Sequence, residues 1–232
     1  MKQFESEHYI LNFHKGSKAE ADIHEIAACQ EACYSDICSV LKTEPHFKIG
    51  YTLCNTREEV GQLYGDNEPC NGFTTAPNKI VAVYNDQIQC IGFHEDAHII
   101  SYTLFRPDCP AIREGLAMYF DRKWWGIQNL DWVGYFLKKG TYLPVDKLLH
   151  RDFFFDNGCE ITYPIMGAFT DYLISTYGIE MFLTVYRQQD IPQAMQVVYH
   201  KTTSELNQDF ISYVRLFKID PILEKRMEEL LA

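Results

Sequence analysis

Residues 94–98 read His94-Glu95-Asp96-Ala97-His98, an H-E-x-x-H motif inside the proline-free stretch 88–104. That stretch is long enough for a helix, in which His94 and His98 would lie about 40° apart around the axis and one turn apart along it. Both imidazoles can therefore bind one metal ion. Glu95 would lie about 100° from His94 around the helix axis. This offset is too large for a third metal ligand, but it suits a carboxylate that takes a proton from water. The motif predicts a metal-binding helix.

A catalytic zinc site usually has three protein ligands, so a third one is needed after the histidines. Glu114 follows His98 after a spacer of fifteen residues, beyond a turn at 106–110 and near the start of a second helical stretch, 112–120. An antiparallel pair of helices joined by that turn would bring Glu114 back beside the histidines. Gly115, with Ala117, would let the helices approach closely. We therefore expect one zinc ion per chain, bound by His94, His98 and Glu114.

Two other interpretations of these residues stay open. The histidines can be ordinary helix residues, with Glu114 an acid that caps its helix. A closed structural site is also conceivable, with a thiolate from Cys90, one turn before His94, or from Cys109 in the turn. That second interpretation assigns no task to Glu95.

The pairing of residues 94–98 with Glu114-Gly115-Leu116-Ala117 resembles the gluzincin zinc metallopeptidases, the peptidase MA-like group with the thermolysin and aminopeptidase N branches. Residues 161–169, followed by Tyr172-Leu173 and Tyr177-Gly178, are similar to the tyrosine-containing helix start of the aminopeptidase-like members. The resemblance implies that the Tyr163 hydroxyl stabilises the oxyanion of the tetrahedral intermediate. It also implies that an edge strand before the zinc helix, within 71–75 or 79–84, pairs with an extended peptide substrate. Met118 departs from the thermolysin branch, which has at this position an Asp that orients a zinc histidine.

The rest of the chain predicts an α+β fold. Strands are expected at 7–14, 47–54 and 79–84, and helices from Ser17 to Pro45 and over 56–64, whereas the chain beyond residue 86 is almost entirely helical in pattern. Later helices are expected over 164–177, with Pro164 in the first turn, and from Thr202. We expect one zincin-like domain, 1–232. Its parts are a mixed sheet at 1–86, the zinc helices at 87–126 and a helical part at 127–232, with the active-site cleft between the sheet and the helical half.

Composition limits the partners. The 232 residues include 21 basic and 32 acidic side chains, a net charge of −11, which disfavours nucleic acid. No apolar run approaches the roughly 18 residues of a membrane span. Eight cysteines without a C-x-x-C pair suggest reduced thiols in a cytoplasmic protein.

These expectations combine into a zinc metallopeptidase that hydrolyses peptide or protein substrates, with Glu95 as the general base. Two alternatives stay open. One is a zinc-binding scaffold or binding module that does not hydrolyse peptides, and the other is a hydrolase of a small non-peptide amide. Substrate length, side-chain preference and oligomeric state are left open.

Overall fold

The computed structural model describes residues 1–231 and contains two compact units, Met1–Phe105 and a second that begins at Arg106. The first holds a mixed β-sheet and the second is helical, so the predicted α+β class is confirmed. The boundary between the units falls inside the predicted zinc-helix part, 87–126. The prediction of a single domain stays a prediction.

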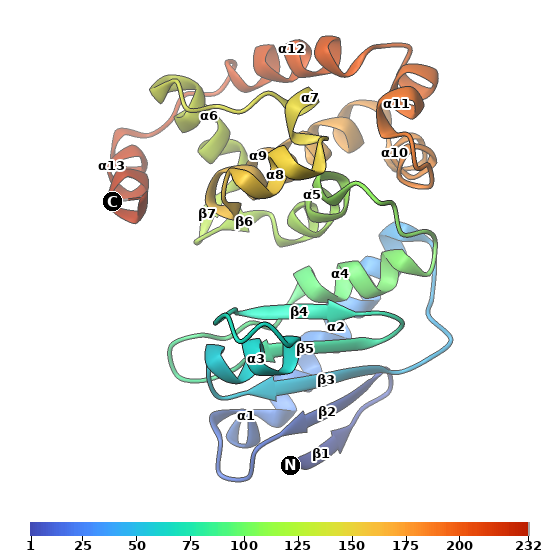
Figure 1. Ribbon diagram of the computed structural model, residues 1–232, viewed down its shortest axis with the longest axis vertical. Helices are drawn as coiled ribbons and strands as arrows, with labels where there is room; N and C mark the ends of the chain where they lie inside the picture. Colours follow the sequence, from blue (N-terminus) through green and yellow to red (C-terminus); the bar gives the residue numbers. More distant parts are fainter. Residues whose placement is uncertain (232) are drawn as a thin grey trace. The chain divides into compact units, whose positions relative to one another are not determined.

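The sheet of the first unit contains, within residues 1–231, five strands: β1 (Lys2–Glu5), β2 (Tyr9–Phe13), β3 (Ile49–Cys54), β4 (Gly72–Thr75) and β5 (Lys79–Val83). Their spatial order is β1-β2-β3-β5-β4 (Figure 1). The three central strands are parallel, and the two outer strands are antiparallel to their neighbours. β2, β3 and β5 match the predicted strands. β1 has no signature in the sequence, because its side chains are mostly exposed at an edge and need no apolar alternation.

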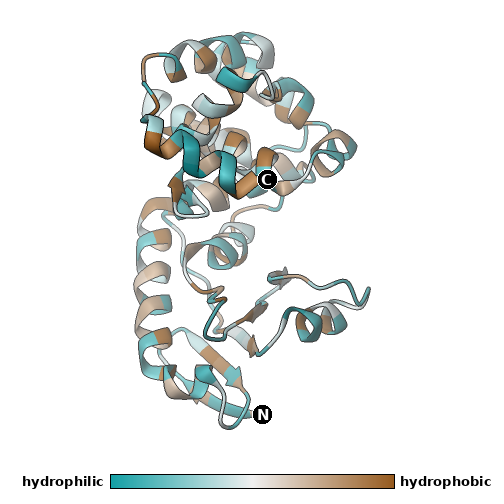
Figure 2. Cartoon of the chain, turned by 90° about the vertical axis from the view of Figure 1, so that its left-hand side faces the viewer, coloured by the Kyte–Doolittle hydropathy of each residue, from teal (hydrophilic) through white to brown (hydrophobic). Residues whose placement is uncertain are grey.

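The helices of this unit are α1 (Lys18–Ala21), α2 (Ile23–Leu41), α3 (Arg57–Tyr64) and α4 (Phe93–Tyr102). The predicted helix after Ser17 is thus divided at Asp22, and the Ser17 hydroxyl caps its first part by accepting from the Glu20 N–H. α2 and α3 cover opposite faces of the sheet (Figures 1 and 2). Figure 2 shows apolar and polar residues interspersed along α2, as in an amphipathic helix. Ile26 and Ile37 of this helix are fully buried.

α4 is shorter than the predicted 88–104, because the residues before it have other structure. Tyr84 and Gln89 form an antiparallel bridge, and the Cys90 N–H donates to the Val83 carbonyl, so this segment folds back on β5. Gly92 then takes a φ of 119°, which side-chain-bearing residues rarely adopt. The helix therefore begins at Phe93, one residue before His94.

The second unit consists mostly of helices: α5 (Pro110–Asp121), α6 (Asn129–Lys139), α7 (Val145–Leu148), α8 (Arg151–Asp156), α9 (Cys159–Tyr177), α10 (Ile179–Tyr186), α11 (Ile191–Tyr199), α12 (Thr203–Val214) and α13 (Pro221–Leu231). Two short strands, β6 (Lys123–Trp124) and β7 (Ile127–Gln128), form a hairpin. The long helix α9 packs against α5, α6 and α10. It begins at Cys159, so Pro164 lies inside the helix and its predicted place in the first turn is wrong. The helix predicted from Thr202 is α12, and Thr202 and Glu205 exchange hydrogen bonds at its start as a capping box.

Among residues 1–231, the helices include none that is both long enough and apolar enough to cross a membrane.

Candidate metal centre

The two histidines of the motif lie on α4, one turn apart, as the spacing predicts. Their ring centroids are 5.1 Å apart and the ring planes are nearly perpendicular, at 86°. His94 is half-buried and His98 is 6% exposed. Two imidazoles in this arrangement can direct one nitrogen each toward a common point beside the helix.

Glu114 is the fifth residue of α5 and is half-buried. One ligand atom each of His94, His98 and Glu114 lies within 4.8 Å of the other two, which makes these residues a group that could hold a metal ion. Ligand atoms about 2.1 Å from a tetrahedral zinc ion are roughly 3.4 Å apart, a separation within the 4.8 Å limit that this group meets. Two neutral imidazoles and one carboxylate are the donor set of a catalytic zinc site that keeps one position open.

Glu95 directs its carboxylate toward β4. The Thr74 hydroxyl donates a hydrogen bond to Glu95 Oε2, and a Cβ added at Gly72 would lie 3.3 Å from Glu95 Oε1. β4 therefore holds one carboxylate oxygen and approaches the other closely. The sequence contains no signal for this contact, because Thr74 lies 21 residues before Glu95.

Asp96, the third residue of the motif, faces away from the metal-binding side and is completely buried. Its Oδ2 accepts hydrogen bonds from the Tyr9 hydroxyl and, at 2.9 Å, from the Gln30 amide. Burial raises the pKa of Asp96 well above its usual value, and the hydrogen bonds from Tyr9 and Gln30 oppose that shift. Burial and the neighbouring carboxylate also raise the pKa of Tyr9. Sequence reasoning assigned no role to any of these three residues.

Tyr163 is the fifth residue of α9 and is half-buried. Its ring stacks on Phe154 with centroids 5.9 Å apart and lies 5.7 Å from the ring of Trp124. These contacts fix the ring, and the role of its hydroxyl as an oxyanion donor stays a prediction. Met118 is fully buried in α5, and its carbonyl accepts a hydrogen bond from the Asn129 amide at 2.9 Å.

Among residues 1–231, the group that could hold a metal ion does not include the thiols of Cys90 and Cys109. Burial raises the pKa of the Cys90 thiol to about 11 and also raises that of Cys109. Both shifts disfavour the thiolate, which is the form that binds metals. The arrangement therefore favours the histidine and carboxylate ligands over a closed thiolate site.

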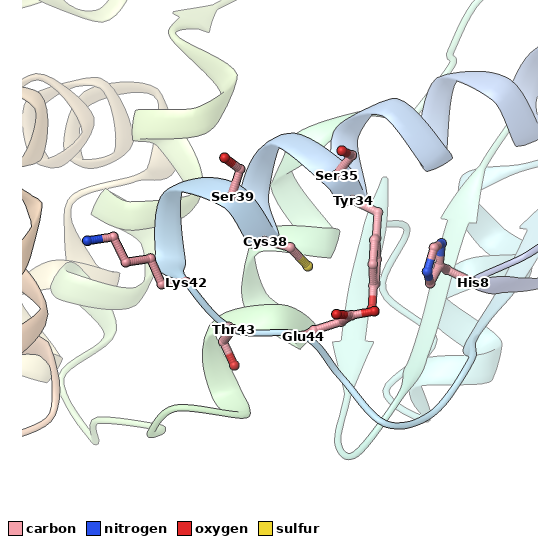
Figure 3. A pocket seen from close by; sticks show the side chains of 8 residues that line it. All are labelled: His8, Tyr34, Ser35, Cys38, Ser39, Lys42, Thr43 and Glu44. Carbon is pink, nitrogen blue, oxygen red and sulfur yellow. The ribbon is translucent and has the colours of Figure 1, made fainter.

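A separate hollow of about 520 Å³ lies at the C-terminal end of α2, lined by His8, Tyr34, Ser35, Cys38, Ser39, Lys42, Thr43 and Glu44 (Figure 3). The His8 and Tyr34 rings stack at 4.0 Å, and His8 Nδ1 lies 2.5 Å from Glu31 Oε2. His8 is thus paired with a carboxylate outside the hollow, and none of the lining residues belongs to the predicted site.

No protein-family model matches this chain, and a search of curated proteins finds no similar sequence. The resemblance to gluzincins therefore rests on the motif residues, and both the class and the activity are proposals.

Proposed function

We propose that this protein is a zinc-dependent metallopeptidase of the gluzincin type. The observation that carries the proposal is the group formed by His94, His98 and Glu114, whose ligand atoms lie within 4.8 Å of one another. When bound there, zinc supplies Lewis acidity and lowers the pKa of a water at its open position.

Glu95 acts in this proposal as the general base. Its Oε2 accepts the hydrogen bond from Thr74, which orients the carboxylate and leaves Oε1 to accept a proton from the attacking water. The water oxygen forms a bond to the carbonyl carbon of the substrate. As the carbon–nitrogen bond breaks, Glu95 returns the proton to the leaving amine. Tyr163 is the proposed hydrogen-bond donor to the oxyanion.

The position of β4 supports a peptide as the substrate. Two segments were candidates for strand pairing with a substrate, and of these β5 is an interior strand whereas β4 is at the edge of the sheet. An edge strand presents backbone N–H and C=O groups to which an extended peptide can add. β4 also carries Thr74, the hydrogen-bond partner of Glu95, so a peptide that adds to this strand would run beside the proposed base.

The test compares the wild-type chain with Glu95→Gln, prepared without added metal or a His tag. We expect about one zinc per chain in both proteins. In the wild type, a mixed peptide pool is cleaved, a chelator stops the cleavage and zinc restores it. Turnover in Glu95→Gln falls at least about 100-fold, because general-base catalysis contributes typically 10²–10⁴-fold. Glu7→Gln, the same change at an exposed position, is the matched control.

Other outcomes contradict the proposal in different ways. Full turnover in Glu95→Gln would exclude the mechanism. Zinc binding without cleavage of peptides or small amides in the wild type would favour the binding-module alternative. Cleavage of small amides alone would favour the amide hydrolase. His98→Ala should lose the metal itself, and zinc retained in that variant would indicate a different ligand set.

A further inference from the structure

A buried polar cluster lies behind the metal-binding helix. Tyr9 of β2, Gln30 of α2 and Asp96 of α4 are all 0% exposed. They come from three different elements, and α2 packs directly against α4. Buried polar groups destabilise the folded protein unless they are hydrogen-bonded. The hydrogen-bond partners of these three side chains therefore indicate their role.

Gln30 holds the start of α4 through backbone atoms. Its Oε1 accepts from the Gly92 N–H at 2.7 Å, and its Nε2 donates to the Gly92 carbonyl at 3.2 Å. Gly92 is the N-cap of α4 and has no side chain to cap the helix itself. The amide of Gln30 therefore supplies from α2 the anchor that the helix terminus lacks.

Asp96 is a second anchor, on the rear of the same helix. It lies two residues after His94 and two before His98, so it is about 200° around the axis from each of them. Its Oδ2 is held by the Tyr9 hydroxyl and by Gln30 Nε2. One anchor at the end and one on the rear together fix both the axial position and the rotation of α4.

The rotation of α4 is decisive for metal binding. A helix side chain reaches about 6 Å from the axis, so a turn of about 15° displaces an imidazole by roughly 1.6 Å. Metal–ligand distances tolerate only about 0.2 Å. Because His94 and His98 lie on the same helix, a rotation of α4 would move both imidazoles together, away from the position of an ion that Glu114 also binds.

The cluster contains one feature that core stability alone does not explain. Asp96 Oδ1 is buried and has no hydrogen-bond partner among residues 1–231. Such an oxygen is destabilising, and an apolar side chain would fill the same place without that cost. This cost is consistent with a role in positioning rather than in core packing.

We propose that Tyr9, Gln30 and Asp96 are positioning residues of the metal centre, which hold α4 in the rotation at which His94 and His98 bind the same ion as Glu114. The inference rests on the proposed metal centre, but not on the peptidase activity.

The test uses the full chain with Tyr9→Phe and Gln30→Ala. Zinc affinity is measured by competition with a chelator, and cobalt(II) is added as a spectroscopic probe of the ligand geometry. We expect both variants to bind zinc about 10–100-fold more weakly, which is typical for lost outer-shell partners, and to show altered cobalt absorption. Asp96→Asn, which keeps an acceptor for both donors, should remain within about threefold of the wild type, whereas Asp96→Ala should not.

Tyr84→Phe is the matched control. Tyr84 is also buried, and its hydroxyl also donates to a carboxylate, Asp22 Oδ2 at 2.9 Å, in a contact that does not involve α4. This variant should keep the zinc affinity and the cobalt spectrum of the wild type, whatever happens to its melting temperature.

The outcomes separate the inference from the proposed function. Wild-type zinc affinity and cobalt spectra in both Tyr9→Phe and Gln30→Ala would overturn the inference, even if the variants melt earlier. A wild-type protein that binds zinc but cleaves no peptide removes the proposed activity and leaves this test intact. A wild-type protein that binds no zinc overturns both. If Asp96→Ala does not fold, Tyr9→Phe decides the question, because it removes only one hydroxyl.

Discussion

Cys29 and Cys33 lie one turn apart on α2, the first exposed and the second buried. A hydrogen bond from the Cys33 thiol stabilises the Cys29 thiolate and lowers the pKa of Cys29 below that of an ordinary thiol. Cys159 is also exposed, but burial and the neighbouring Glu160 raise its pKa. Two exposed thiols of one chain therefore differ in reactivity, because the thiolate is the nucleophile.

We predict that iodoacetamide at pH 7 modifies Cys29 about tenfold faster than Cys159, since more of Cys29 is thiolate at that pH. Brief labelling followed by mass spectrometry of the peptides measures both rates. Cys33→Ala should lower the modification rate of Cys29 toward that of an ordinary thiol, because the substitution removes the hydrogen bond to the Cys29 thiolate. Equal rates at the two cysteines of the wild type would show that the hydrogen bond has no such effect.

At the scale of elements, α5 and α9 cross at glycines that allow close contact. A Cβ at Gly115 would lie 2.6 Å from Thr170 Oγ1 and 3.0 Å from the Met166 carbonyl oxygen, both on α9. The sequence predicted that Gly115 serves the approach of the two zinc helices, and the structure shows that it accommodates α9. A Cβ at Gly167 would lie 2.6 Å from Met118 Cβ, an atom fixed to the backbone of α5.

Gly167→Ala should lower the free energy of unfolding by about 1–3 kcal/mol, because the added methyl would overpack a contact that cannot move. This cost in free energy exceeds the stabilisation that Ala gives as the better helix former. Urea unfolding measures the change. Gly134→Ala in α6 is the control: its added methyl meets side-chain atoms of Ile219 at 3.2 Å and of Val214 at 3.9 Å, which can move. If Gly134→Ala lowered the free energy of unfolding as much as Gly167→Ala, the argument from close contact would be contradicted.

At the scale of the whole molecule, the proposed ligands come from two helices that follow each other in the chain, α4 and α5. An ion that binds the native chain and not the unfolded chain stabilises the protein by mass action. Free zinc at 100 times the dissociation constant contributes about 2.7 kcal/mol.

We therefore predict that such a zinc concentration raises the melting temperature by roughly 5–10 °C for a chain of this length, and that a chelator reverses the shift. Glu114→Gln should lose most of the shift, because it removes the charged ligand. Glu7→Gln should retain it. Calorimetry with and without zinc measures these differences, and an undiminished shift in Glu114→Gln would exclude Glu114 as a ligand.

Local patterns in the sequence predicted the features that depend on neighbours in the chain. The spacing of His94 and His98 on one helix face and the start of a helix after Thr202 arise from contacts within one or two turns, so periodicity and helix-start signals reveal them. The mixed sheet followed by helices was predictable for the same reason. The early start of α9 was not, because Pro164 is an ambiguous signal that also fits a position inside a helix.

Contacts between distant residues left no such pattern. Tyr9 lies 87 residues before Asp96, Gln30 lies 66 before it, and Thr74 lies 21 before Glu95. Each of these side chains is ordinary in its own segment, and only folding brings it to α4. The motif thus predicted the metal-binding chemistry that we propose for α4, whereas the tertiary structure decided which residues form hydrogen bonds to that helix and to Glu95, because hydrogen bonds formed across the fold depend on spatial neighbours and not on sequence spacing.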